Sequence, residues 1–155
     1  KQIDESDLLQ ALRISGHRTL ELVHAIPEEK FDYRYAPEKW SIRELLCHMI
    51  DAERIFAYRA LRFARNDKTP LSGWDENEYA PQANASGRSK SSIAQEMAHV
   101  RMSTLDLFES FTPEMLVRKG IANKNELSVV ALGFIIAGHE THHCQVIKER
   151  YLIKK

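Results

Sequence analysis

Residues 128–146 read SVVALGFIIAGHETHHCQV. A serine at the start of this stretch can cap a helix, and apolar residues then recur at helical spacing. One face of the predicted helix carries Leu132, Ile136, His139, His143 and Val146. The nearly uncharged run from Val129 to Gly138 is only about half as long as a bilayer span requires. We therefore expect a helix that faces a globular core, with two histidines on its inward side.

Apolar residues at the same spacing predict two helices nearer the N-terminus. The first is expected from about Ser6 to Ala25, shortly before Pro27, with apolar positions Leu8, Leu12, Leu20, Val23 and Ile26. The second opens at a capping box formed by Ser41 and Glu44 and fades near Asn66. Its apolar face consists of Leu45, Met49, Ala52, Phe56 and Ala60.

A third long helix is expected after residues 67–88, a stretch rich in Pro, Gly and Asn that we predict to be a long loop. Ser92-Ile93-Ala94-Gln95 is its candidate capping box. Its inward positions are Ile93, Met97, Val100, Thr104, Leu107 and Phe111. Thr112-Pro113-Glu114 predicts a short turn of helix before an irregular stretch to Leu127. Because no strand pattern is recognised, the sequence predicts an all-α four-helix bundle in a single domain, residues 1–155.

The long loop over residues 67–88 also constrains the order of the helices. It is longer than antiparallel neighbours need, and such a crossover allows the second and third helices to run parallel. The last helix then runs antiparallel to the second. At a rise of about 1.5 Å per residue, this arrangement places His48 of the second helix near the level of His143.

His139 and His143 are four residues apart, so their imidazoles lie on one helix face about one turn apart. Two histidines at this spacing can bind one metal ion, as in zincins. Together with His48, three imidazoles can converge on one divalent ion and leave a coordination position open, which is typical of catalytic metals. The alternative is a structural bundle whose core histidines are satisfied by hydrogen bonds.

Two Glu-x-x-His motifs offer another kind of metal site, that of the di-iron carboxylate bundles. They are Glu96-Met97-Ala98-His99 and Glu140-Thr141-His142-His143. We disfavour this site, because Glu96 and His99 flank the apolar stripe and the first two helices carry no evident pair of inward glutamates. His142 points about 100° away from each neighbour on the helix. His142 and Glu140 are the candidates for proton transfer.

Composition excludes several classes of protein. Acidic and basic residues balance at 22 each, so no global field draws the chain to nucleic acid or to an anionic membrane. Cys47 and Cys144 are too few for a secreted disulfide scaffold, and no apolar signal core follows the basic start. We therefore expect a cytoplasmic protein.

The remaining histidines, cysteines and tryptophans have weaker interpretations. His17 and His24 are expected at the surface. The cysteines are interpreted as small buried residues, with a thiolate ligand or a disulfide as alternatives. Trp40 is interpreted as a packing anchor. Trp74, in the long loop, could equally wall a pocket or pack.

The segments around the three histidines resemble the DinB-like superfamily. They are residues 39–54, KWSIRELLCHMIDAER, and residues 138–145, GHETHHCQ. The resemblance covers almost the whole chain. Its most specific part is the pairing of a histidine in the second helix with His-x-x-x-His in the last.

This resemblance implies an up-down-down-up bundle that binds a divalent ion, zinc or nickel, through His48, His139 and His143. It also implies a metal-dependent enzyme: several members transfer thiols such as bacillithiol or mycothiol, one branch isomerises maleylpyruvate, and many are named as hydrolases without a known substrate. A small-molecule substrate such as a low-molecular-weight thiol, and a homodimer, are therefore expected. The alternative is a non-catalytic metal-binding or stress-response module.

Overall fold

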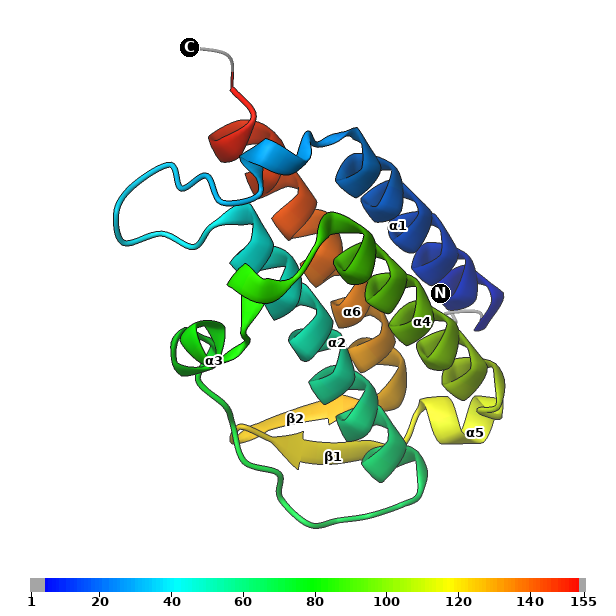
Figure 1. Ribbon diagram of the computed structural model, residues 1–155. Helices are drawn as coiled ribbons and strands as arrows, with labels where there is room; N and C mark the ends of the chain where they lie inside the picture. Colours follow the sequence, from blue (N-terminus) through cyan, green and yellow to red (C-terminus); the bar gives the residue numbers. More distant parts are fainter. Residues whose placement is uncertain (1–4, 154–155) are drawn as a thin grey trace.

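Four long helices build the fold: α1 (Glu5–Ala25), α2 (Ile42–Ala64), α4 (Lys90–Glu109) and α6 (Val129–Val146). The structure, a computed structural model, describes residues 5–153. In Figure 1 the four helices lie side by side, and α3 and a β-hairpin stand at one side of them. Helices α1 and α2 each pack against both α4 and α6. The prediction of an all-α four-helix bundle is confirmed.

Contacts between helix ends show the directions of the four helices. Lys90, at the start of α4, donates to the carbonyl oxygen of Ile26 just beyond α1 (2.8 Å), so these helices are antiparallel. Tyr151, beyond α6, donates to the carbonyl oxygen of Trp40 just before α2 (2.8 Å), so these are antiparallel as well. Arg43, near the start of α2, donates to a backbone carbonyl just before α4, so α2 and α4 are parallel. The expected up-down-down-up order is present.

Serine caps begin three of the long helices. Ser41 and Glu44 form the predicted capping box of α2, and Ser128 accepts a backbone N–H from the first turn of α6 (3.1 Å). The capping box predicted at Ser92 is wrong. Ser89 caps α4 instead, because its hydroxyl accepts the backbone N–H of Ser92 (3.1 Å), which places Ser92 inside the first turn.

The segment predicted as a loop, residues 67–88, contains two helical elements. Asp75 caps α3 (Glu76–Gln82) by accepting the backbone N–H of Asn77 (2.9 Å), and a 3₁₀ turn, η2 (Ala85–Gly87), follows. The prediction failed because a helix of 7 residues shows too little of the helical repeat to be recognised in a stretch rich in Pro, Gly and Asn.

A β-hairpin occupies most of the irregular stretch expected before α6. Strand β1 (Lys119–Ala122) pairs antiparallel with β2 (Asn125–Ser128). The turn residues Asn123 and Lys124 have φ angles of 49° and 66°, as a two-residue type I′ turn requires. The sequence concealed this hairpin because its strands are 4 residues long and β1 buries small residues rather than the β-branched ones that mark strands.

The hairpin also holds the loop that precedes α3. The backbone N–H of Leu71 donates to the carbonyl oxygen of Ile121 (2.9 Å), and its carbonyl oxygen accepts from the N–H of Asn123 (2.9 Å). These bonds form a parallel bridge beside β1. The hairpin therefore fixes the backbone at Leu71, and Trp74 follows three residues later in the chain.

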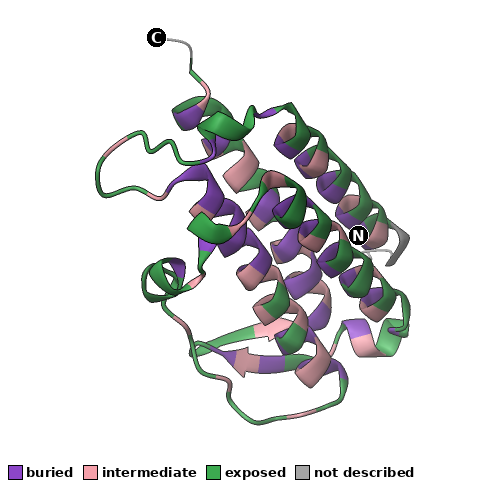
Figure 2. Ribbon diagram, in the orientation of Figure 1, coloured by how far each residue is buried: buried purple, intermediate pink, exposed green. Residues whose placement is uncertain are grey.

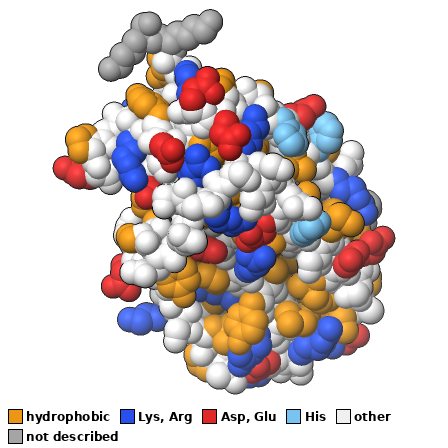
Figure 3. All heavy atoms as spheres, viewed as in Figure 1, with side chains coloured by type: hydrophobic (Ala, Val, Ile, Leu, Met, Phe, Trp, Pro, Cys, Tyr) orange, Lys and Arg blue, Asp and Glu red, His pale blue; other side chains and the backbone are white. Residues whose placement is uncertain are grey.

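Three short elements complete the described chain: η1 (Glu28–Lys30), α5 (Pro113–Leu116) and a π-helical turn, η3 (Ile147–Tyr151). Thr112 caps α5, as predicted. Figure 2 shows buried residues on the inward sides of the long helices and exposed residues on their outer sides. On the face in Figure 3, acidic and basic side chains are interspersed. Within residues 5–153, no helix combines the length and apolarity that crossing a bilayer requires.

Two glycines of α6 provide a matched test of this packing. An added Cβ at Gly133 would lie 2.7 Å from Leu8 and 2.8 Å from the buried ring of Phe108, whereas nothing lies within 4 Å of one at Gly138. We expect Gly133→Ala to destabilise the protein by about 1–3 kcal/mol. Gly138→Ala should stabilise it by about 0.5–1 kcal/mol, because alanine favours the helix. Urea unfolding measures both changes, and equal effects of the two substitutions would contradict this packing.

Candidate metal centre

Three histidine side chains from α2 and α6 converge in the structure. The Nε2 atom of His139 lies 3.1 Å from Nε2 of His48 and 3.0 Å from Nε2 of His143. The three nitrogens lie within 4.8 Å of one another, and residues 5–153 contain no other group of three or more His, Cys, Asp or Glu so arranged. The structure thus brings together the three residues that the sequence singled out as candidate ligands.

The bundle holds these histidines at one level. His48 lies about two turns after the capped start of α2, and His139 and His143 lie in the last turns of α6. Since the two helices are antiparallel, the start of α2 lies beside the end of α6. The hydrogen bond from the Tyr151 hydroxyl to the Trp40 carbonyl (2.8 Å) ties these two ends together.

Aromatic rings surround the cluster. The ring centroid of Trp40 lies 4.8 Å from that of His48, and Trp74 stacks on His48 at 5.7 Å. Phe56 meets the ring of His139 edge-on at 5.7 Å. Trp40 also packs against the core, as expected, and Trp74 reaches the centre from the loop before α3. These rings restrict the access of water to the histidines.

Burial keeps the three imidazoles neutral. Burial is the largest cause that lowers the pKa of His48, which falls to about 4. Electrostatic repulsion from a protonated His139 is the smaller cause. Burial is also the largest cause for His143, whose pKa falls to about 3, and burial lowers the pKa of His139. At neutral pH each ring therefore has one nitrogen with a lone pair available to a metal ion.

The hydrogen-bonding state of the cluster fits a cation. The Nδ1 atoms of His48 and His143 are buried without a hydrogen-bond partner in the described part of the chain. The direction of any hydrogen bond between the Nε2 atoms of the three rings depends on their tautomers. With each ring proton on Nδ1, three Nε2 lone pairs face one another. A cation at the point that these nitrogens share would satisfy all three at once. Three imidazole donors suit zinc, nickel, copper or iron.

A cavity of about 300 Å³ opens beside the cluster. Its wall includes the aromatic residues Trp40, Tyr35 and Tyr151 and the polar residues Lys39, His142 and His143. The ring of His142 lies 5.2 Å from that of His143. A cavity of this size can hold a small molecule. His143, one of the three candidate metal ligands, forms part of its wall.

The other candidates from the sequence lie elsewhere. Glu140 does not line this cavity but is buried in an ion pair with Arg101 (2.7 Å), so it is not placed for proton transfer there. His99 is exposed, and Glu96 pairs with Arg54 (2.6 Å). The two Glu-x-x-His motifs do not meet, and a di-iron site is not formed by the described residues.

Both cysteines are free thiols. Cys47 is buried, and Cys144 is half-buried with its sulfur 3.3 Å from the hydroxyl oxygen of Thr19. Burial raises the pKa of both thiols, and neither belongs to the three-nitrogen cluster. Cys47 is thus a small buried residue, as the favoured interpretation held, whereas Cys144 is only partly buried. His17 and His24 are exposed, as expected.

Arg101 is one of several buried charged residues that were not foreseen from the sequence. Arg101 is 6% exposed and pairs with Glu53 (2.8 Å) as well as with Glu140. The signal was present, because Arg101 stands four residues after Met97 and three before Thr104, on the inward stripe of its helix. A charge at an inward position requires a buried partner.

Comparison with known proteins gives the same family as the histidine motifs. The sequence model of the DinB superfamily matches residues 11–147, which include all three histidines. A protein from Oceanobacillus iheyensis, named provisionally as a metal-dependent hydrolase, is 26% identical over 147 residues. The matched region covers 94% of this chain and 84% of that protein.

Among solved structures, the fold is similar to that of YfiT from Bacillus subtilis. YfiT is described as a probable metal-dependent hydrolase with an unusual four-helix bundle topology. The two superimpose with a TM-score of 0.80 at 18% identity, over 94% of this chain and 84% of that chain. At this identity the likeness shows a shared fold.

Proposed function

Because this chain belongs to the DinB superfamily, we propose that it is a metal-dependent enzyme of the transferase or hydrolase type. His48, His139 and His143 would hold one divalent ion, for which zinc and nickel are the first candidates. The observation behind this proposal is the convergence of three nitrogens within 4.8 Å of one another, beside a cavity of about 300 Å³. The hydrolase names of both relatives support the same class of activity.

When bound, such an ion supplies Lewis-acid chemistry, because it lowers the pKa of a coordinated water or thiol and polarises an electrophile. Three protein ligands leave coordination open, as in catalytic sites. Trp40, Trp74 and Phe56 restrict water around the three histidines. A drier site strengthens electrostatic interactions inside it.

The cavity beside His143 is the proposed substrate site. Tyr35 and Tyr151, whose rings meet edge-to-face at 4.8 Å, offer apolar surface on its wall. Lys39 and His142 offer polar groups there. We propose a small molecule as the substrate, with a low-molecular-weight thiol as one candidate. His142, exposed on this wall next to a candidate ligand, is the residue we propose for proton transfer. A homodimer and a cytoplasmic location belong to the same proposal, on the family resemblance alone.

Metal-dependent turnover tests this function. Protein loaded with zinc or with nickel is expected to couple an aryl halide to a thiol from a panel of low-molecular-weight thiols, or to hydrolyse an activated ester. His142→Gln is expected to lower kcat by about 100-fold or more, the usual contribution of a general acid or base, and to leave metal content unchanged. His17→Gln, on the exposed face of α1, serves as the matched control and should retain full turnover.

Each outcome distinguishes one part of the proposal. Turnover that persists in chelator would contradict the role of the metal, and full activity of His142→Gln would contradict the role of His142. Metal-loaded protein without turnover on any thiol or ester would contradict an enzyme. That result would favour a non-catalytic metal-binding module.

A further inference from the structure

A second, much smaller cavity lies against His139. Its volume is about 10 Å³, about the space that one water molecule needs. Apolar side chains form most of its wall, and the polar residues on it are Glu53, His139 and Glu140. The proposed substrate cavity shares none of these residues. A cavity of this size with several polar groups meets the conditions for a structural water.

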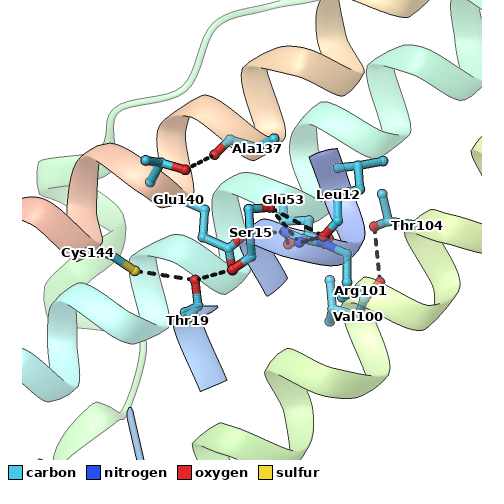
Figure 4. Close-up of polar contacts among 11 residues, drawn as sticks. Leu12, Ser15, Thr19, Glu53, Val100, Arg101, Thr104, Ala137, Glu140 and Cys144 are labelled. Atoms are coloured by element: carbon cyan, nitrogen blue, oxygen red, sulfur yellow. Dashed lines mark hydrogen bonds and ion pairs between the residues drawn. The ribbon is translucent and has the colours of Figure 1, made fainter. Parts of the chain in front are cut away.

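Arg101 holds the two carboxylates of this cavity in place. Its Nε and Nη2 atoms donate to the two oxygens of Glu53 (2.8 and 3.0 Å), and Nη2 also donates to Oε2 of Glu140 (2.7 Å). On the side of α1, Nη1 donates to the carbonyl oxygen of Leu12 (2.6 Å) and to Oγ of Ser15 (3.1 Å). Figure 4 shows the side chains of Glu53, Arg101 and Glu140 pointing toward one another. The orientation of both carboxylates is thereby fixed.

Two of the residues that line the cavity each retain a polar atom without a hydrogen-bond partner among the described residues. Oε1 of Glu140 and Nδ1 of His139 form no hydrogen bond with another described residue. Unlike the Nδ1 atoms of His48 and His143, which are fully buried, that of His139 retains some accessible surface. When Nε2 of His139 binds a metal, its ring proton resides on Nδ1 and requires an acceptor.

We propose that one water in this cavity accepts the Nδ1–H of His139 and donates to Glu53 and Glu140, so that the Arg101 network orients His139 for the metal. Glu53 and Glu140 are then positioning residues, and the inference rests on the proposed metal site. The carboxylates of Glu53 and Glu140 are paired with a single guanidinium, that of Arg101. The three groups together therefore carry one net negative charge near His139. This charge favours the partial positive charge that an imidazole acquires when it coordinates a cation.

Zinc affinity tests this role without any assay of turnover. Glu140→Gln retains the shape of the side chain and removes its charge. We expect the Kd for Zn²⁺, measured by competition with a chromophoric chelator, to rise by about tenfold or more, as when other outer partners of metal-bound histidines are lost. Glu53→Gln should act in the same direction. Ser15→Ala is the matched control, because it removes a hydrogen bond from the opposite side of the same guanidinium. It should lower stability and leave the Kd unchanged.

The outcomes separate positioning from a merely structural role. Unchanged zinc affinity in the folded Glu140→Gln and Glu53→Gln variants would overturn the proposal. An equal loss of affinity in Ser15→Ala would overturn it too, because any damage to the network would then have the same effect. Wild-type protein that binds no zinc would show instead that the metal site itself is wrong.

A crystal structure of the zinc-loaded wild type tests the water directly and needs no variant. It is expected to show one water in the small cavity, within hydrogen-bond distance of Nδ1 of His139. An empty cavity, or a water that contacts neither Glu53 nor Glu140, would overturn the proposal.

Discussion

Replacing His143 with alanine is expected to weaken zinc binding by about 100-fold or more. Structural zinc sites with four ligands contribute about 10–16 kcal/mol of binding free energy, or about 3 kcal/mol per ligand. A factor of ten in affinity corresponds to about 1.4 kcal/mol. His143 supplies one of three converging nitrogens, so its loss leaves only two protein ligands. Calorimetric titration of the protein with Zn²⁺ measures the change.

The same substitution should cost little stability once metal is removed. Nδ1 of His143 is buried without a partner among the described residues, and an unsatisfied buried polar group costs about 1–3 kcal/mol. Its removal offsets the packing lost with the ring. His99→Ala is the control, because His99 is exposed and belongs to the Glu-x-x-His motif of α4. Zinc affinity retained by His143→Ala, or lost in His99→Ala, would contradict the three-histidine site.

Replacing Arg101 with methionine is expected to lower the free energy of unfolding by about 3–5 kcal/mol, the usual result of leaving buried charges without their partner. The guanidinium bonds to groups on α1, α2 and α6. Its removal leaves the carboxylates of Glu53 and Glu140, whose side chains are 12% and 10% exposed, without a cation. Urea unfolding in the presence of a chelator measures this effect apart from metal binding.

Arg54→Met is the matched control on a neighbouring helix. Arg54 pairs with Glu96, but its side chain is 56% exposed, and exposed ion pairs contribute about 0–1 kcal/mol. Adding Glu53→Gln and Glu140→Gln to Arg101→Met should recover much of the lost stability, because no buried charge is then left unpaired. A loss as small for Arg101→Met as for Arg54→Met would contradict a buried network.

The long helices could be predicted because each repeats its apolar positions over several turns. The end of α1 was predicted from Pro27, and the starts of α2 and α6 were predicted from the caps Ser41 and Ser128. Such signals can be read locally, because a cap acts within one turn of the chain. At α4 the sequence offered several serines, and Ser89 rather than Ser92 accepts the free N–H groups. Local patterns alone did not decide between them.

The parts that were not predicted depend on contacts between distant residues. The hairpin β1–β2 lies against the loop around Leu71 and buries small side chains, so its strands lack the usual alternation of large residues. The position of Arg101 was visible in its spacing, but its partners Glu53 and Glu140 lie on two other helices. Only the folded structure shows that Arg101 forms ion pairs with both carboxylates.

The convergence of His48 with His139 and His143 was within reach of the sequence for a different reason. The i, i+4 spacing fixed two rings on one face of α6, and the length of the crossover suggested the direction of α2. The sequence did not show which aromatic residues surround the three histidines. Trp74 reaches His48 through a loop that the hairpin holds, so its contact depends on the whole tertiary structure.

The metal content of protein prepared without a histidine tag tests the central claim most directly. After incubation with zinc or nickel and removal of unbound metal, elemental analysis is expected to find about one divalent ion per chain in the wild type. His48→Ala should retain almost none. A wild type that retains no divalent ion after this treatment, or a His48→Ala variant that retains as much as the wild type, would contradict a metal centre built from His48, His139 and His143.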